Sequence, residues 1–165
     1  MHITYEDDIT IIFINNYVTK DIDFNDIDEI KEYFKYIFLK LKDSLKLESS
    51  GYYLVKVYKD ISGVIIELKE ESDYYDLYDD EIEMKIILEE TSFLYQIEDI
   101  FIDNYFLNNS SIIKYNNKIY LKLNNKIDDI KIGYLYEISK LMYKDTYNII
   151  KYGKYLSFKK PLNLI

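Results

Sequence analysis

The sequence EESDYYDLYDDEIE at residues 70–83 carries eight carboxylates and three tyrosines but no lysine. Residues 1–83 contain 21 acidic residues and 9 lysines, a net charge of −12. Residues 84–165 contain 9 acidic residues and 12 lysines, a net charge of +3. A run of like charges repels itself and rarely packs into a core. We therefore expect residues 70–83 to be an acidic, tyrosine-containing linker between an N-terminal lobe, residues 1–69, and a C-terminal lobe, residues 84–165.

The composition predicts a folded protein that is rich in sheet. The chain has 165 residues, of which 48% are hydrophobic, which is enough to form a core. It contains no alanine, tryptophan or arginine, while isoleucine and tyrosine dominate. β-branched and aromatic residues favour strands over helices. The scarcity of residues with GC-rich codons fits an AT-rich genome.

The first half predicts a β-α-β-β lobe. A β-branched run at residues 9–14 predicts a strand. Residues 26–45 predict a helix capped by Asn25, because apolar side chains recur at steps of three and four. This stripe consists of Ile27, Ile30, Phe34, Ile37, Phe38, Leu41 and Leu45. Residues 52–58 and 63–69 predict a hairpin with a loop at residues 59–62.

The second half predicts a smaller sheet with one main helix. Residues 98–109 are ambiguous and favour at most a short helix. Asn116-Asn117 predicts a two-residue hairpin turn, because asparagine tolerates positive φ. A helix is predicted at residues 129–143, with Asp128 or Asp129 as its cap. The predicted strands are residues 84–88, 93–97, 111–115, 119–123, 147–152 and 155–158. The expected fold class is therefore α+β, with each lobe a main helix packed on an antiparallel sheet.

The sequence offers no assembled catalytic, metal or cofactor site. His2 is the only histidine and there is no cysteine, so the usual nucleophile–base pairs and thiolate metal sites are excluded. The carboxylates occur as adjacent pairs without the spacing and central glycine of a calcium loop. None of the four glycines lies in a phosphate-binding pattern. We expect no enzyme activity and no cofactor.

Nucleic acid and membrane are not expected partners. Tyr115, Lys118, Tyr120 and Lys122 on a predicted hairpin suggest base stacking, but the charge of +3 is small, arginine is missing and the acidic run repels phosphates. No apolar stretch reaches the roughly 18–20 residues of a membrane helix. The N-terminus lacks the features of a signal peptide. We expect a cytoplasmic protein.

Three interpretations of the acidic segment remain open: a solvated linker, a docking element for a basic partner, and a mimic of nucleic-acid charge. In the docking interpretation, apolar anchors lie amid carboxylates, and tyrosine is frequent at binding hot spots. The candidate protein-binding residues are Tyr74, Tyr75, Leu77, Tyr78, Asp79 and Asp80.

Several stretches resemble MecA-type adaptor proteins, which deliver substrates to the Clp unfoldase–protease of low-GC bacteria. They are EDDITIIFINNYVTKDIDFNDIDEI (6–30), GYYLVKVYKDISGVIIELK (51–69), FLYQIEDI (93–100), SSIIKYNNKIYLKL (110–123) and YNIIKYGKYL (147–156). The resemblance implies a substrate-binding N-terminal lobe, a C-terminal lobe that docks on the unfoldase, and no catalytic activity. It assigns no individual contact residue.

The leading hypothesis is a non-catalytic protein–protein interaction module that acts as such an adaptor. Its partners would be a substrate protein and the unfoldase. One alternative is a carboxylate- and Mg²⁺-dependent enzyme. Another is a self-associating structural protein, because so many isoleucine- and tyrosine-rich strands need their edges protected.

Overall fold

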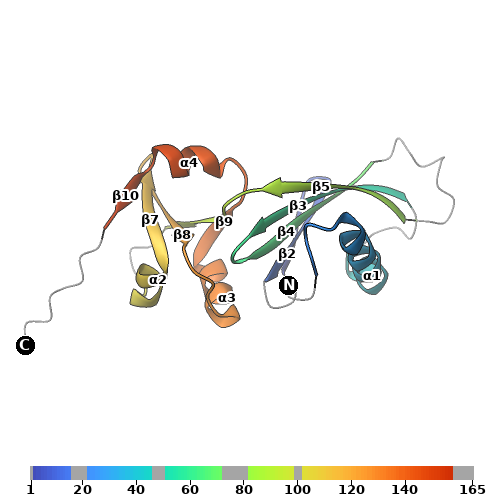
Figure 1. Ribbon diagram of the computed structural model, residues 1–165, viewed down its shortest axis with the longest axis horizontal. Helices are drawn as coiled ribbons and strands as arrows, with labels where there is room; N and C mark the ends of the chain where they lie inside the picture. Colours follow the sequence, from blue (N-terminus) through green and yellow to red (C-terminus); the bar gives the residue numbers. More distant parts are fainter. Residues whose placement is uncertain (1, 16–21, 46–50, 72–81, 99–101, 158–165) are drawn as a thin grey trace, which may run out of the picture. The chain divides into compact units, whose positions relative to one another are not determined.

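Two five-stranded sheets form the framework of the computed structural model, which describes residues 2–15, 22–45, 51–71, 82–98 and 102–157. Contacts divide the chain into two units, Met1–Glu90 and Thr91–Ile165, each built around one sheet (Figure 1). Both sheets carry helices, so the predicted α+β class is confirmed.

The sheet of the first unit has the order β1-β2-β4-β3-β5. Its strands are β1 (His2–Glu6), β2 (Ile9–Asn15), β3 (Gly51–Asp60), β4 (Gly63–Glu70) and β5 (Ile82–Glu90). All neighbours are antiparallel except β3 and β5, which are parallel over nine residue pairs. The predicted hairpin is confirmed, although its loop is only Ile61-Ser62. Strand β1 was not predicted. It pairs with β2 across a turn at Asp7, whose φ is 52°.

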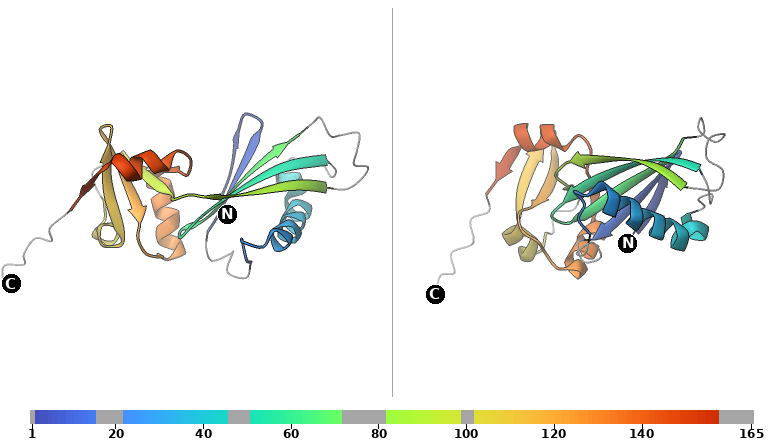
Figure 2. Two further views of the ribbon diagram at one scale, coloured as in Figure 1. Left: turned by 45° about the horizontal axis from the view of Figure 1, so that its top comes forward. Right: turned by 45° about the vertical axis from the view of Figure 1, so that its right-hand side comes forward.

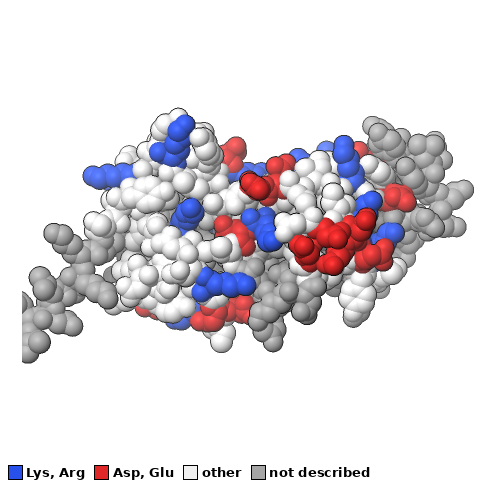
Figure 3. All heavy atoms as spheres, in the orientation of Figure 1, with Lys and Arg blue, Asp and Glu red and all other residues white. Residues whose placement is uncertain are grey.

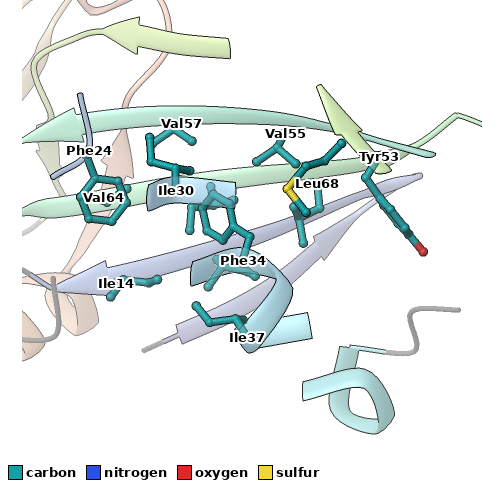
Figure 4. Packing of buried hydrophobic residues seen from close by; sticks show 13 residues of the cluster. Ile14, Phe24, Ile30, Phe34, Ile37, Tyr53, Val55, Val57, Val64 and Leu68 are labelled. Atoms are coloured by element: carbon teal, nitrogen blue, oxygen red, sulfur yellow. The ribbon is translucent and has the colours of Figure 1, made fainter. Parts of the chain in front are cut away.

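Helix α1 (Ile27–Leu45) covers one face of this sheet, as its apolar stripe predicts (Figures 1 and 4). Asp26, rather than Asn25, caps the helix: its Oδ1 accepts hydrogen bonds from the backbone N–H groups of Asp28 at 2.9 Å and Glu29 at 3.3 Å. Phe34 is fully buried among aliphatic side chains from α1 and the sheet (Figure 4). The cluster consists of Ile12, Ile14, Phe24, Ile30, Phe34, Ile37, Tyr53, Val55, Val57, Val64, Ile66, Leu68 and Met84.

The sheet of the second unit has the order β10-β7-β8-β6-β9 and is antiparallel throughout. Helix α4 lies on one face, while α2 and α3 lie on the other (Figures 1 and 2). The elements are β6 (Leu94–Ile97), α2 (Asn104–Asn109), β7 (Ser110–Tyr115), β8 (Lys118–Leu123), α3 (Asp129–Ile138), β9 (Ser139–Met142), α4 (Thr146–Tyr152) and β10 (Lys154–Leu156).

In this unit the predicted turn and helix cap are confirmed, whereas the end of one helix and one strand are wrong. Asn116 and Asn117 both have positive φ, 46° and 60°, and form the predicted two-residue turn. Asp128 caps α3 through a 2.9 Å hydrogen bond from Lys131 N. However, α3 ends at Ile138, because the following residues leave the helix and pair with β6 as β9. The predicted strand at residues 147–152 is the helix α4.

The boundary between the units also differs from the prediction. Strand β5 was assigned to a C-terminal lobe, but it pairs with β3 in the first sheet, and the units divide between Glu90 and Thr91. The first unit therefore contains 23 acidic residues and 10 lysines, a net charge of −13. The second contains 7 acidic residues and 11 lysines, a net charge of +4. The difference in net charge between the two units is therefore larger than the difference between the two halves defined from the sequence.

Within the described ranges, no helix combines the length and the apolar character needed to cross a lipid bilayer.

Candidate protein-binding site

The binding residues predicted from the sequence lie in a connection within the first sheet. Glu70 ends β4, while Ile82 and Glu83 begin β5. Because β3 lies between β4 and β5, these strand ends are two strand spacings apart, about 10 Å. The acidic segment thus joins two strands of one sheet, not two lobes. Its candidate residues Tyr74, Tyr75, Leu77, Tyr78, Asp79 and Asp80 lie outside the described residues.

A second candidate surface lies on helix α4 of the second unit. Thr146 and Ile149 are buried, and Ile149 packs with core residues of the sheet. Tyr147 and Tyr152 project from the remaining surface of the helix and are 66% and 65% exposed. Tyr155 on β10 is 51% exposed. Three exposed phenol rings within nine residues are a large aromatic area to leave in water, which is typical of a binding surface.

Lysine and backbone contacts hold these rings in place. Lys151 Nζ lies 5.3 Å from the ring centroid of Tyr147 and 5.2 Å from that of Tyr152, within the range of a cation–π interaction. The Tyr155 hydroxyl donates a hydrogen bond to the Ile150 carbonyl at 3.2 Å. We call Tyr147, Lys151, Tyr152 and Tyr155 the Tyr–Lys surface.

Gly153 fixes the turn that connects the two parts of this surface. Its N–H donates to the Ile149 carbonyl at 2.9 Å and closes the end of α4. A Cβ at this position would overlap the same carbonyl oxygen and the Ile113 side chain. Only glycine therefore allows the chain to turn so closely from α4 into β10. The turn sets the positions of Tyr152 and Tyr155 relative to each other.

The surroundings of the Tyr–Lys surface are basic. Residues 110–126 contain four lysines and no acidic residue, and residues 139–157 contain four lysines and one acidic residue. Strand alternation and register place Lys118, Lys122 and Lys140 on the sheet face that α4 covers. In contrast, the segments containing α2 and α3, residues 102–109 and 127–138, hold four acidic residues and one lysine. Figure 3 shows lysines scattered over the second unit and a continuous acidic patch on the first.

One residue of the hairpin considered for base stacking is not available for it. Tyr120 is only 4% exposed and packs with Leu94, Ile113 and Ile149. Burial raises the pKa of the Tyr120 phenol above its ordinary value, and electrostatic repulsion from Tyr115 raises this pKa by a smaller amount. A ring in the core cannot stack on a nucleic-acid base.

The first unit contains a buried carboxylate that the sequence did not single out. Glu67 is 4% exposed, and the Tyr58 hydroxyl donates a 3.2 Å hydrogen bond to its Oε2. Burial raises the pKa of Tyr58, and the charges of Glu67 and Glu89 raise it further. This phenol therefore keeps its proton at neutral pH and supports the carboxylate, rather than acting as a nucleophile. Sequence reasoning missed the pair because strand alternation alone predicts Glu67 to be solvated.

Within the described residues, no group of three or more histidine, aspartate or glutamate side chains is arranged to hold a metal ion. No protein-family model, curated protein or solved structure matches the chain.

Proposed function

We propose that the chain is a non-catalytic protein–protein interaction module that binds an acidic protein partner through the Tyr–Lys surface. The observation that carries this proposal is the exposure of Tyr147, Tyr152 and Tyr155, the first two of which lie against Lys151. Tyrosine provides a large contact area at a low cost in conformational entropy and is frequent at hot spots. Lys118, Lys122 and Lys140, on the sheet face that α4 covers, and Lys151 on α4 itself favour an acidic partner.

A protein partner fits this surface better than a nucleic acid does. The whole chain has a net charge of −9 and no arginine, which weakens the attraction of a polyanion at long range. A short acidic protein segment carries fewer charges, so the net negative charge of the chain opposes its binding less.

The finer form of the proposal is an adaptor that presents substrate proteins to a Clp-type unfoldase. Its support is the sequence resemblance alone. The direct test measures whether the purified chain stimulates a Clp-type unfoldase in degrading a bound substrate. Failure there would remove the adaptor role and leave the interaction module intact.

The experiment for the module compares partner capture by matched variants. The immobilised full chain, the variant Tyr147→Ser/Tyr152→Ser and the control Ile130→Ser are exposed to the same low-salt lysate. Ile130 is a suitable control because it is 83% exposed and lies on α3. We expect at least one protein to be captured by the chain and by the control but lost with the double variant. Capture of no protein, or equal capture by all three, would contradict the proposal.

A further inference from the structure

Strand β5 is a long edge strand with an unusual side-chain pattern. It spans nine residues and, among the described residues, pairs only with β3, at the margin of the sheet (Figure 2). Its centre is aliphatic: Ile86 and Ile87 are half-buried, and Leu88 is 40% exposed. Lys85 and Glu89, both exposed, flank this centre. An open edge of this length is a template for adding another strand.

The sequence of β5 is complementary to itself in one register. Two copies of β5 related by a two-fold axis pair antiparallel. In each opposing pair, the N–H and C=O groups of both residues point either towards the other strand or away from it, and this direction alternates from one residue to the next. The residue numbers of each opposing pair therefore add up to an even number. With Ile87 opposite Ile87 of the second copy, Lys85 lies opposite Glu89 twice, and Ile86 lies opposite Leu88 twice. Opposite charges and aliphatic pairs across strands are both stabilising.

The neighbouring registers lack this match. Centring the pair on Ile86 places Glu83 opposite Glu89, and centring it on Lys85 places two lysines opposite each other. Centring it on Leu88 places both Ile86 and Ile87 opposite glutamates. Like charges directly opposite each other are destabilising. The charges on β5, which would keep a foreign strand away, therefore select a second copy of the same strand.

We propose that the chain forms a two-fold homodimer in which β5 pairs antiparallel with β5 of a second copy, centred on Ile87. The two first-unit sheets then form one continuous sheet of ten strands. Leu88, which is 40% exposed, gains Ile86 of the second copy as its neighbour. This proposal does not depend on the proposed function of the Tyr–Lys surface, which lies in the other unit.

The test is a charge swap measured by sedimentation equilibrium of the full chain in about 0.15 M salt, where long-range repulsion is screened. We expect a dimer, with Lys85→Glu and Glu89→Lys each raising the dissociation constant at least about tenfold, because like charges then oppose each other. The double variant Lys85→Glu/Glu89→Lys restores both attractive pairs, and its dissociation constant returns to within about threefold of the original.

Matched controls carry the same charge changes away from the edge. Lys114→Glu and Glu137→Lys alter exposed side chains of the second unit and leave the dimer unchanged. Circular dichroism verifies that each variant is folded. A wild-type chain that stays monomeric up to about 0.2 mM overturns the proposal. So does a dimer that is insensitive to both single variants, or a double variant that fails to regain association.

Discussion

Replacing Phe34 by alanine is expected to remove much of the stability of the first unit. Phe34 is 0% exposed and lies in the cluster between α1 and the sheet (Figure 4). Loss of a buried phenyl ring costs about 3–5 kcal/mol, because transfer energy is lost and a cavity remains. A unit of 90 residues has a typical free energy of unfolding of about 5–13 kcal/mol. The change is therefore large enough to unfold a unit at the lower end of this range.

Native-state hydrogen exchange measures this effect for each unit separately. In Phe34→Ala, the slowest-exchanging amides of β2 and β4 should lose protection equivalent to about 3–5 kcal/mol. The matched control is Leu39→Ala on the same helix. Leu39 is 74% exposed, so its truncation should change the free energy of unfolding by less than about 0.5 kcal/mol.

A loss below about 1 kcal/mol in Phe34→Ala would contradict tight packing of this ring, since a buried ring that packs poorly or relaxes freely gives such a value. Equal effects of the two substitutions would refute it as well. In that case, α1 would not be held on the sheet by its apolar stripe.

Three further predictions concern backbone conformation, and a fourth concerns a surface ion pair. Gly63→Ala should lower the free energy of unfolding by about 1–3 kcal/mol, because φ is +152° and a Cβ would overlap a β2 carbonyl oxygen. Gly133 lies on α3 with open space around it, so Gly133→Ala should raise the free energy of unfolding by about 0.5–1 kcal/mol. Thermal unfolding measures both changes. Asn117→Val should cost about 1–2 kcal/mol in the same assay, since its φ of 60° strains a β-branched residue, whereas Asn117→Gly should cost nothing. Lys69 lies 3.0 Å from Asp8 and is the main cause that lowers the pKa of the Asp8 carboxyl. The pair stabilises the fold above the unfolded pKa of about 3.9, and this contribution is lost as the pH falls through the folded value. In NMR titrations, Lys69→Met should move the Asp8 pKa back towards its ordinary value; an unchanged value would exclude the pair.

The sequence correctly predicted α1 and the Asn116-Asn117 turn, because their conformation depends mainly on their own residues. The stripe of α1 fixes a helix whatever it packs against, and Asn116-Asn117 tolerates the positive φ of a tight turn. Helix α4 was mistaken for a strand because tyrosine and isoleucine favour strands. In the structure, Thr146 and Ile149 are buried three residues apart, which is the spacing of one helix face. In a strand, the adjacent residues Ile149 and Ile150 would face opposite sides.

Long-range pairing could not be predicted in the same way. Residues 84–88 were recognised as a strand, but no local feature indicates that β5 joins β3 rather than β6. Because β3 lies between β4 and β5, the chain must pass one end of β3 on its way from β4 to β5. The acidic segment is this connection. Its charge suggested a boundary between lobes, because a solvated connection within a domain has the same composition as a linker. The Tyr–Lys surface depended on the α4 assignment and was missed for that reason.

The position of the acidic segment bears on whether two copies can associate through β5. The segment leads into Ile82, at the start of the strand. In an antiparallel pair centred on Ile87, the two Ile82 positions are ten residues apart along the paired strands, about 34 Å. This separation of the two attachment points is several times the Debye length of about 8 Å at physiological salt, so charges close to the two Ile82 positions repel each other only weakly. A parallel pairing would bring both segments to the same end of the joined sheet. Charge in the connection and charge on the edge therefore favour the same antiparallel arrangement.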